Sequence, residues 1–102
     1  MLPPHYHPND EAGTVLSGTF YTGMGNRFDK RLGHPLSARS YAFVPNGIRH
    51  FAWVEEPTEV QVHGLGPWEL IAVDAAGHSK GRPFTLPLRR MRINERVRSR
   101  DR

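Results

Sequence analysis

The sequence contains no cysteine, no long apolar run and no stretch with the periodicity of an amphipathic helix. The lack of cysteine excludes a disulfide scaffold, a thiol nucleophile and a thiolate metal site. No apolar run approaches the roughly 20 residues that a membrane-spanning helix needs. The first residues show neither the basic start nor the apolar stretch of a secretory signal. These absences predict a cytoplasmic protein without a transmembrane segment.

The net charge of +4 is distributed unevenly along the 102 residues. Residues 1–78 hold five basic and eight acidic side chains, a balance of −3, whereas residues 79–102 hold nine basic and two acidic ones, a balance of +7. We therefore predict a folded domain over 1–78 and a basic tail over 79–102 that is disordered or loosely packed. Only this tail is a candidate for contact with nucleic acid or an anionic surface, without sequence specificity.

Ten glycines and nine prolines divide the chain into short segments that favour strands. β-branched and aromatic residues predict a strand region with a break at Ser17-Gly18, followed by further short strands. The predicted strand regions are residues 13–22, 40–44, 48–54, 59–63 and 68–73. Residues 27–35 are predicted to form a loop, because Gly33 and Pro35 interrupt any regular element there. Short strands separated by turns predict an all-β sandwich or barrel.

Three histidines and one carboxylate stand out as candidates for chemistry. His5 and His7 are two residues apart, so on an extended segment both imidazoles point to the same side. Glu11 follows the Pro8-Asn9 turn and can fold back towards them, and His50 from a distant strand would complete a set of three nitrogens and one oxygen. Such a set binds divalent transition ions and leaves positions open for water or substrate. The alternative is that His5 and His7 are solvated polar residues of a proline-rich loop.

The spacing of these residues resembles the two sequence motifs of the cupin superfamily. His5-x-His7-x-x-x-Glu11, followed six residues later by Gly18, is similar to the first motif. Pro45-x-Gly47-x-x-His50 is similar to the core of the second motif. Residues 7–25 and 61–67 also resemble a group of small, single-domain bacterial cupin proteins of the cupin 2-like type. The resemblance implies an all-β fold, a double-stranded β-helix or jelly-roll barrel.

The same resemblance implies that His5, His7, Glu11 and His50 are the ligands of one divalent transition metal ion per chain. Iron, manganese, zinc, nickel, cobalt and copper all suit this ligand set. Asp10 competes with Glu11 for the carboxylate role, but the motif spacing favours Glu11.

The chain departs from the cupin pattern in three places. The glycine that opens the second motif would fall at Arg39, and the asparagine that closes it would fall at Val54. Cupin barrels also have several strands before the first motif, whereas here the motif begins at residue 5. A barrel incomplete at its N-terminus would expose a sheet edge and therefore predicts a homodimer. Alternatively, residues 84–88 form a strand that covers this edge.

Gln61 and His63 are weaker candidates for the pocket, because they alternate with Val60 and Val62. If the valines face the barrel interior, Gln61 and His63 face outward. With the opposite orientation, both polar side chains would line the pocket near the metal ion.

The leading functional hypothesis is a small metal-binding cupin with an open-coordination site that acts on a small molecule. If it is an enzyme, the resemblance favours a dioxygenase-type oxidoreductase, with isomerase or lyase chemistry second. The alternative is a non-catalytic module that binds or senses a small molecule or a metal ion. A third hypothesis is a truncated chain without a function of its own. The catalytic residues and the substrate are not predicted.

Overall fold

The computed structural model describes residues 2–64, 68–81, 84–86 and 90–93. Its regular elements are ten strands and one short 3₁₀ helix. They are β1 (Leu2–Tyr6), β2 (Glu11–Ser17), β3 (Thr19–Met24), η1 (Lys30–Leu32), β4 (His34–Ser37), β5 (Tyr41–Val44), β6 (His50–Trp53), β7 (Thr58–Gly64), β8 (Trp68–Ala72), β9 (Phe84–Leu86) and β10 (Arg90–Ile93). The prediction of an all-β fold is therefore confirmed. No helix within the described ranges is long and apolar enough to cross a membrane.

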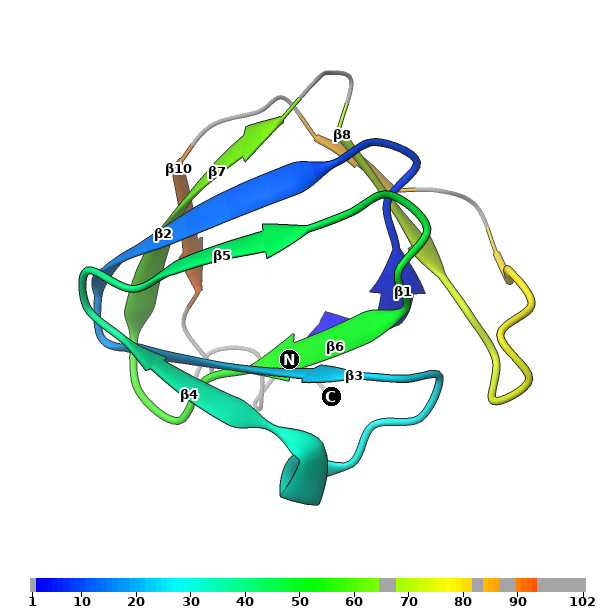
Figure 1. The fold of residues 1–102 in the computed structure, drawn as a ribbon, viewed down its shortest axis with the longest axis horizontal. Coiled ribbons are helices and arrows are strands. Elements are labelled where there is room, and N and C mark those ends of the chain that lie inside the picture. The colour runs from blue at the N-terminus through cyan, green and yellow to red at the C-terminus, as the bar shows by residue number, and fades with distance from the viewer. Residues whose placement is uncertain (1, 65–67, 82–83, 87–89, 94–102) are drawn as a thin grey trace.

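The strands form two antiparallel sheets that wrap around a common interior (Figure 1). The six-stranded sheet has the order β4-β3-β6-β1-β8-β9, and the four-stranded sheet has the order β10-β7-β2-β5. Strand β1 thus lies inside its sheet, between β6 and β8. The pairing of β1 with β6 is irregular between Leu2 and His5, where Pro3 and Pro4 have no N–H to donate.

The interior is built from alternate residues of the two sheets. Val15, Val60 and Val62 form a buried cluster in the four-stranded sheet. Phe20 from β3 packs against this cluster, as do Leu36 and Leu70. In β7 the valines face inward, while Gln61 is half-buried and His63 is exposed, because successive side chains of a strand point to opposite faces.

Strand β6, which begins with His50, is buried along its whole length. The packing around it therefore fixes the position of His50. The Trp53 ring stacks on the Tyr21 ring with ring centroids 5.0 Å apart. The Phe28 and Trp53 rings form a T-shaped pair with centroids 5.5 Å apart. Gly33 lies so close to the six-membered ring of Trp53 that a Cβ atom at position 33 would collide with the indole. This aromatic packing holds η1 and the preceding loop against the outer side of β6.

The predicted break between the first two long strands is confirmed at Gly18. Its φ of 81° lies in the left-handed region that favours glycine. A Cβ atom there would also lie 2.5 Å from Thr58 Oγ1. The prediction of a loop over residues 27–35 is wrong at its end, since β4 begins at His34. Pro35 is compatible with a strand here because β4 is the edge strand of its sheet.

Two strands lie in the region predicted as a basic tail. Phe84 of β9 pairs with Leu70 of β8, and Met91 of β10 pairs with Val60 of β7. A strand around Phe84, one of the two alternatives for this region, is therefore confirmed for residues 84–86, and residue 88 lies outside the described residues. The division of the chain at residue 78 stays a prediction.

Arg39 has a φ of 78°, and it is the one non-glycine residue of the described chain in the left-handed region. This is the position at which the cupin motif has glycine, so the backbone keeps the glycine conformation although the side chain has changed. The turn is held by hydrogen bonds that join Val15 to it: Arg39 N donates to the Val15 carbonyl at 2.7 Å, and Val15 N donates to the Ser40 carbonyl at 2.9 Å.

We expect Arg39→Gly to stabilise the protein, because glycine adopts a positive φ without the steric cost that an L side chain carries, about 1 kcal/mol. Chemical denaturation measures the free energy of unfolding. The matched control is Ala38→Gly, at an exposed neighbour that is not among the residues with a positive φ. This control should destabilise the protein, because it only adds freedom to the unfolded chain. Equal destabilisation by both substitutions would contradict the prediction.

Candidate metal centre

Three buried histidines converge from two neighbouring strands of the six-stranded sheet. His5 of β1 is the register partner of His50 of β6, and His7 follows directly after β1 on the same side as His5. The exposed fractions of His5, His7 and His50 are 1%, 3% and 6%. Burial of three imidazoles together is unusual for side chains that water would otherwise solvate.

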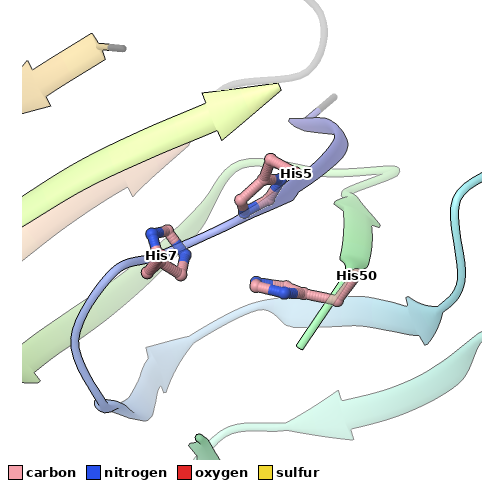
Figure 2. A group of neighbouring side chains, drawn as sticks. All are labelled: His5, His7 and His50. Atoms are coloured by element: carbon pink, nitrogen blue, oxygen red, sulfur yellow. The ribbon is translucent and has the colours of Figure 1, made fainter. Parts of the chain in front are cut away.

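The three rings are turned towards one another (Figure 2). Their centroids lie 4.8 Å apart for His5 and His7, 4.2 Å for His5 and His50, and 5.1 Å for His7 and His50. One potential ligand nitrogen from each ring lies within 4.8 Å of the others. A single ion bound at about 2.0–2.1 Å from each nitrogen would fit between them after a small contraction.

Each ring is oriented by a backbone carbonyl. The Nδ1 atoms of His5, His7 and His50 lie 2.6 Å, 2.6 Å and 2.9 Å from the carbonyl oxygens of Pro3, Glu69 and Ile48. A carbonyl oxygen only accepts, so each Nδ1 carries the proton and each neutral ring has its lone pair on Nε2. This is the usual arrangement of metal-binding histidines, in which an outer hydrogen bond fixes the tautomer and the ring plane.

The surroundings keep these imidazoles neutral, which is the form that binds a metal ion. Burial, reinforced by His50, lowers the pKa of His5 to about 3, against the opposing effect of its hydrogen bond to Pro3. Burial also lowers the pKa of His7 and the pKa of His50. The carbonyls of Glu69 and Ile48 act against these two shifts but do not reverse them.

Glu11, the first residue of β2, brings a carboxylate to the cluster. Its Oε2 lies 3.2 Å from His7 Nε2, and its side chain is 14% exposed. With the His7 proton on Nδ1, a lone pair of Nε2 faces a carboxylate oxygen, which is repulsive unless a proton or a metal ion lies between them. Three neutral imidazole nitrogens and one carboxylate oxygen form a donor set that fits a divalent transition ion.

Asp10 has a different role from its neighbour. Its Oδ1 accepts hydrogen bonds from Asn46 N at 2.8 Å and from Asn46 Nδ2 at 3.1 Å, in an exposed position. Gly47 N also donates to the His7 carbonyl at 2.9 Å. Asp10 therefore fastens the segment after β1 to the 45–47 turn, and this turn leads into His50.

A cavity of about 160 Å³ adjoins the cluster. Its wall includes the three histidines and Glu11, and most of the other lining residues are apolar. Gln61 and His63 are not among the described lining residues, whereas the valines that alternate with them are. His34 also lines the cavity. No sequence pattern pointed to His34, because it lies in a segment predicted to be a loop.

Part of the chain is similar in sequence to a plant protein. A stretch of 52 residues, 50% of this chain, is 36% identical to Germin-like protein subfamily T member 2 of Arabidopsis thaliana. The match spans 24% of that relative, about a quarter of its length. No protein-family model matches the chain, and no solved structure matches it.

The chain contains a cupin-like domain. Germin-like proteins are members of the cupin superfamily, and the two antiparallel sheets of this chain form the double-stranded β-helix that the sequence predicts. The cupin-like domain also places its three histidines together, as expected for a metal-binding cupin.

Proposed function

We propose that this cupin-like domain binds one divalent transition metal ion through His5, His7, His50 and Glu11. The observation that carries the proposal is the convergence of three neutral imidazoles whose Nδ1 atoms are already hydrogen-bonded to carbonyls. Iron, manganese, zinc, nickel, cobalt and copper all fit such a donor set. Four protein ligands leave coordination positions for water or a small molecule.

The residues around the cluster support a site for a small molecule. Once bound, the ion would supply Lewis acidity or oxygen activation to a molecule in the cavity. The Glu11 carboxylate lowers the net charge of the centre, which favours a neutral or singly charged ligand. Val15, Val60 and Val62 form an apolar part of the cavity wall, which a bound molecule would contact with its hydrocarbon surface.

Within this function we propose dioxygenase-type oxidoreductase chemistry, with a non-catalytic binding or sensing module as the alternative. The two are distinguished by oxygen uptake. Uptake that requires both added Fe(II) and an organic compound, and that His50→Ala removes, would support the oxygenase. Saturable binding of the same compound without product formation would support the module.

We expect Glu11→Gln to weaken metal binding, because it replaces a charged oxygen donor with a neutral amide next to His7. Asp10→Asn should leave metal binding within about twofold of the unmodified protein, since Asp10 faces Asn46. Equilibrium dialysis against Zn²⁺ or Co²⁺ measures both affinities. The loss for Glu11→Gln should be about tenfold or more. A larger loss for Asp10→Asn than for Glu11→Gln would show that the carboxylate ligand has been assigned to the wrong residue.

We further propose a folded unit over residues 1–78 with a basic region after it, a homodimer, a cytoplasmic location, and kinship with the small bacterial cupins. Strand β4 forms an edge of its sheet and can pair with a second copy, which supports the homodimer. Sedimentation of the purified chain would measure its oligomeric state.

A further inference from the structure

The cavity beside the histidine cluster has an apolar wall. Alkyl and aromatic side chains from both sheets form most of its lining, among them Val15, Phe20, Leu36, Val60 and Val62. Three of these form the main buried cluster of the domain, with the other two packed against it. A ligand in this space would exchange water for hydrocarbon over most of its surface, which favours an apolar ligand.

Charged and hydrogen-bonding groups are few along the same wall. Apart from the three histidines and Glu11, the polar side chains among the described lining residues are those of Thr22 and His34. The Thr22 hydroxyl donates to the Phe51 carbonyl at 3.3 Å. No lysine or arginine lines the described part of the cavity. A sugar would leave hydroxyls unpaired there, and a phosphate or dicarboxylate would lack a side-chain cation.

The size of the cavity limits the ligand further. Its volume of about 160 Å³ is close to that of an engineered apolar cavity of about 150 Å³ that binds benzene. An apolar side chain also lies where the cavity reaches the surface, because Met24 lines the cavity while 61% of its surface remains exposed. An apolar molecule could therefore contact hydrocarbon both as it enters and after it is bound.

We propose that the cavity binds a small, mainly apolar molecule, about the size of one aromatic ring or a short branched chain, that directs a single oxygen donor to the histidine cluster. The oxygen donor rests on the proposed metal site, whereas the apolar body rests only on the cavity wall.

Four probes test this ligand class by calorimetric titration of the full chain. Toluene represents the apolar body, and phenol adds one oxygen donor. Glucose and inorganic phosphate represent the polar classes. Each is titrated into protein loaded with Zn²⁺, which is redox-silent, and into protein treated with a chelator. We expect toluene to bind equally in both states, and phenol to bind about tenfold more tightly in the Zn²⁺ state. Glucose should not bind, and phosphate should bind more weakly than phenol.

Two substitutions locate the binding in the cavity. Ala42→Phe adds a phenyl group to the wall, and Met24→Gln replaces an apolar side chain with a polar amide where the cavity reaches the surface. Each should weaken toluene and phenol binding by about tenfold, the loss expected from about 60 Å² of apolar contact, without changing the zinc content. Tyr41→Trp is the matched control, because Tyr41 is the exposed neighbour of Ala42 on the opposite face of β5. It should leave both affinities unchanged.

The outcomes separate this inference from the proposed metal site. Toluene binding without zinc binding would support the apolar cavity and contradict the metal site. Zinc binding without toluene or phenol binding would overturn the inference and leave the metal site standing. Tighter binding of glucose or phosphate than of phenol would also overturn it, as would unchanged affinities in both cavity variants. Since Met24 is 61% exposed, Met24→Gln gives a result even if Ala42→Phe does not fold.

Discussion

Replacement of His50 with alanine is expected to remove most of the metal from the purified protein. His50 is the member of the cluster that comes from β6, and it faces His5 across the pairing of β1 with β6. The substitution deletes a direct nitrogen donor and leaves the other imidazoles at one side of the site. Loss of an outer partner alone costs about 10–100-fold in metal affinity, so the loss of a ligand should exceed about a hundredfold. His7→Ala should have an effect of the same order.

Elemental analysis of the purified variants and competition with a chromogenic chelator measure this effect. His78→Ala is the matched control, because His78 is an exposed histidine that lies 3.8 Å from Asp74 and outside the cluster. Circular dichroism establishes that each variant keeps its β structure. Metal content that is unchanged in both His7→Ala and His50→Ala would refute the assignment of the site.

Metal-free protein is expected to lose stability as the pH falls from about 6.5 towards 3. The pKa of His5 is about 3 in the folded state and 6.5 in the reference state. Between these values the unfolded chain binds a proton that the folded chain does not, so the free energy of unfolding decreases as the pH decreases. From pH 7 to pH 5, His5 alone accounts for about 2 kcal/mol. The lowered pKa values of His7 and His50 act in the same direction.

Urea denaturation of chelator-treated protein at pH 7 and pH 5 measures this loss. The interval lies above the range in which most carboxylates titrate, so the histidines dominate the difference. A His5→Gln variant should show a smaller difference between the two pH values, because its side chain does not titrate. Equal stability of the unmodified protein at pH 7 and pH 5 would contradict the neutral, buried state of the cluster.

Much of the fold could be predicted because local rules agreed with the tertiary structure. β-branched alternation located β2, β3 and β7, and the glycine at position 18 marked the break between the first two. Strand β4 was missed because Pro35 usually interrupts a strand, and only its place at the sheet edge makes it acceptable. Strand β1 was not assigned because Pro3 and Pro4 are unusual in a strand. Its strand conformation depends on pairing with β6 on one side and β8 on the other.

The meeting of His5, His7 and His50 could be predicted from the sequence, but their surroundings could not. The spacing of His5 and His7, together with the second motif, indicated which histidines would meet. The hydrogen bond from His7 to the Glu69 carbonyl could not be predicted, because it joins residues that only the folded chain brings together. The same is true of His34, whose position in the cavity wall depends on the pairing of β4 with β3.

Because β1 lies inside its sheet, the histidine cluster can form only when most of the chain has folded. His5 pairs with His50, 45 positions later, and with Ala72, 67 positions later, so these contacts form only after long loops have closed. A peptide of residues 5–11 would contain two of the histidines and the carboxylate, but neither the third imidazole nor the carbonyls of Glu69 and Ile48. High-affinity metal uptake during refolding would therefore follow the assembly of the sheet, and not the collapse of a local segment.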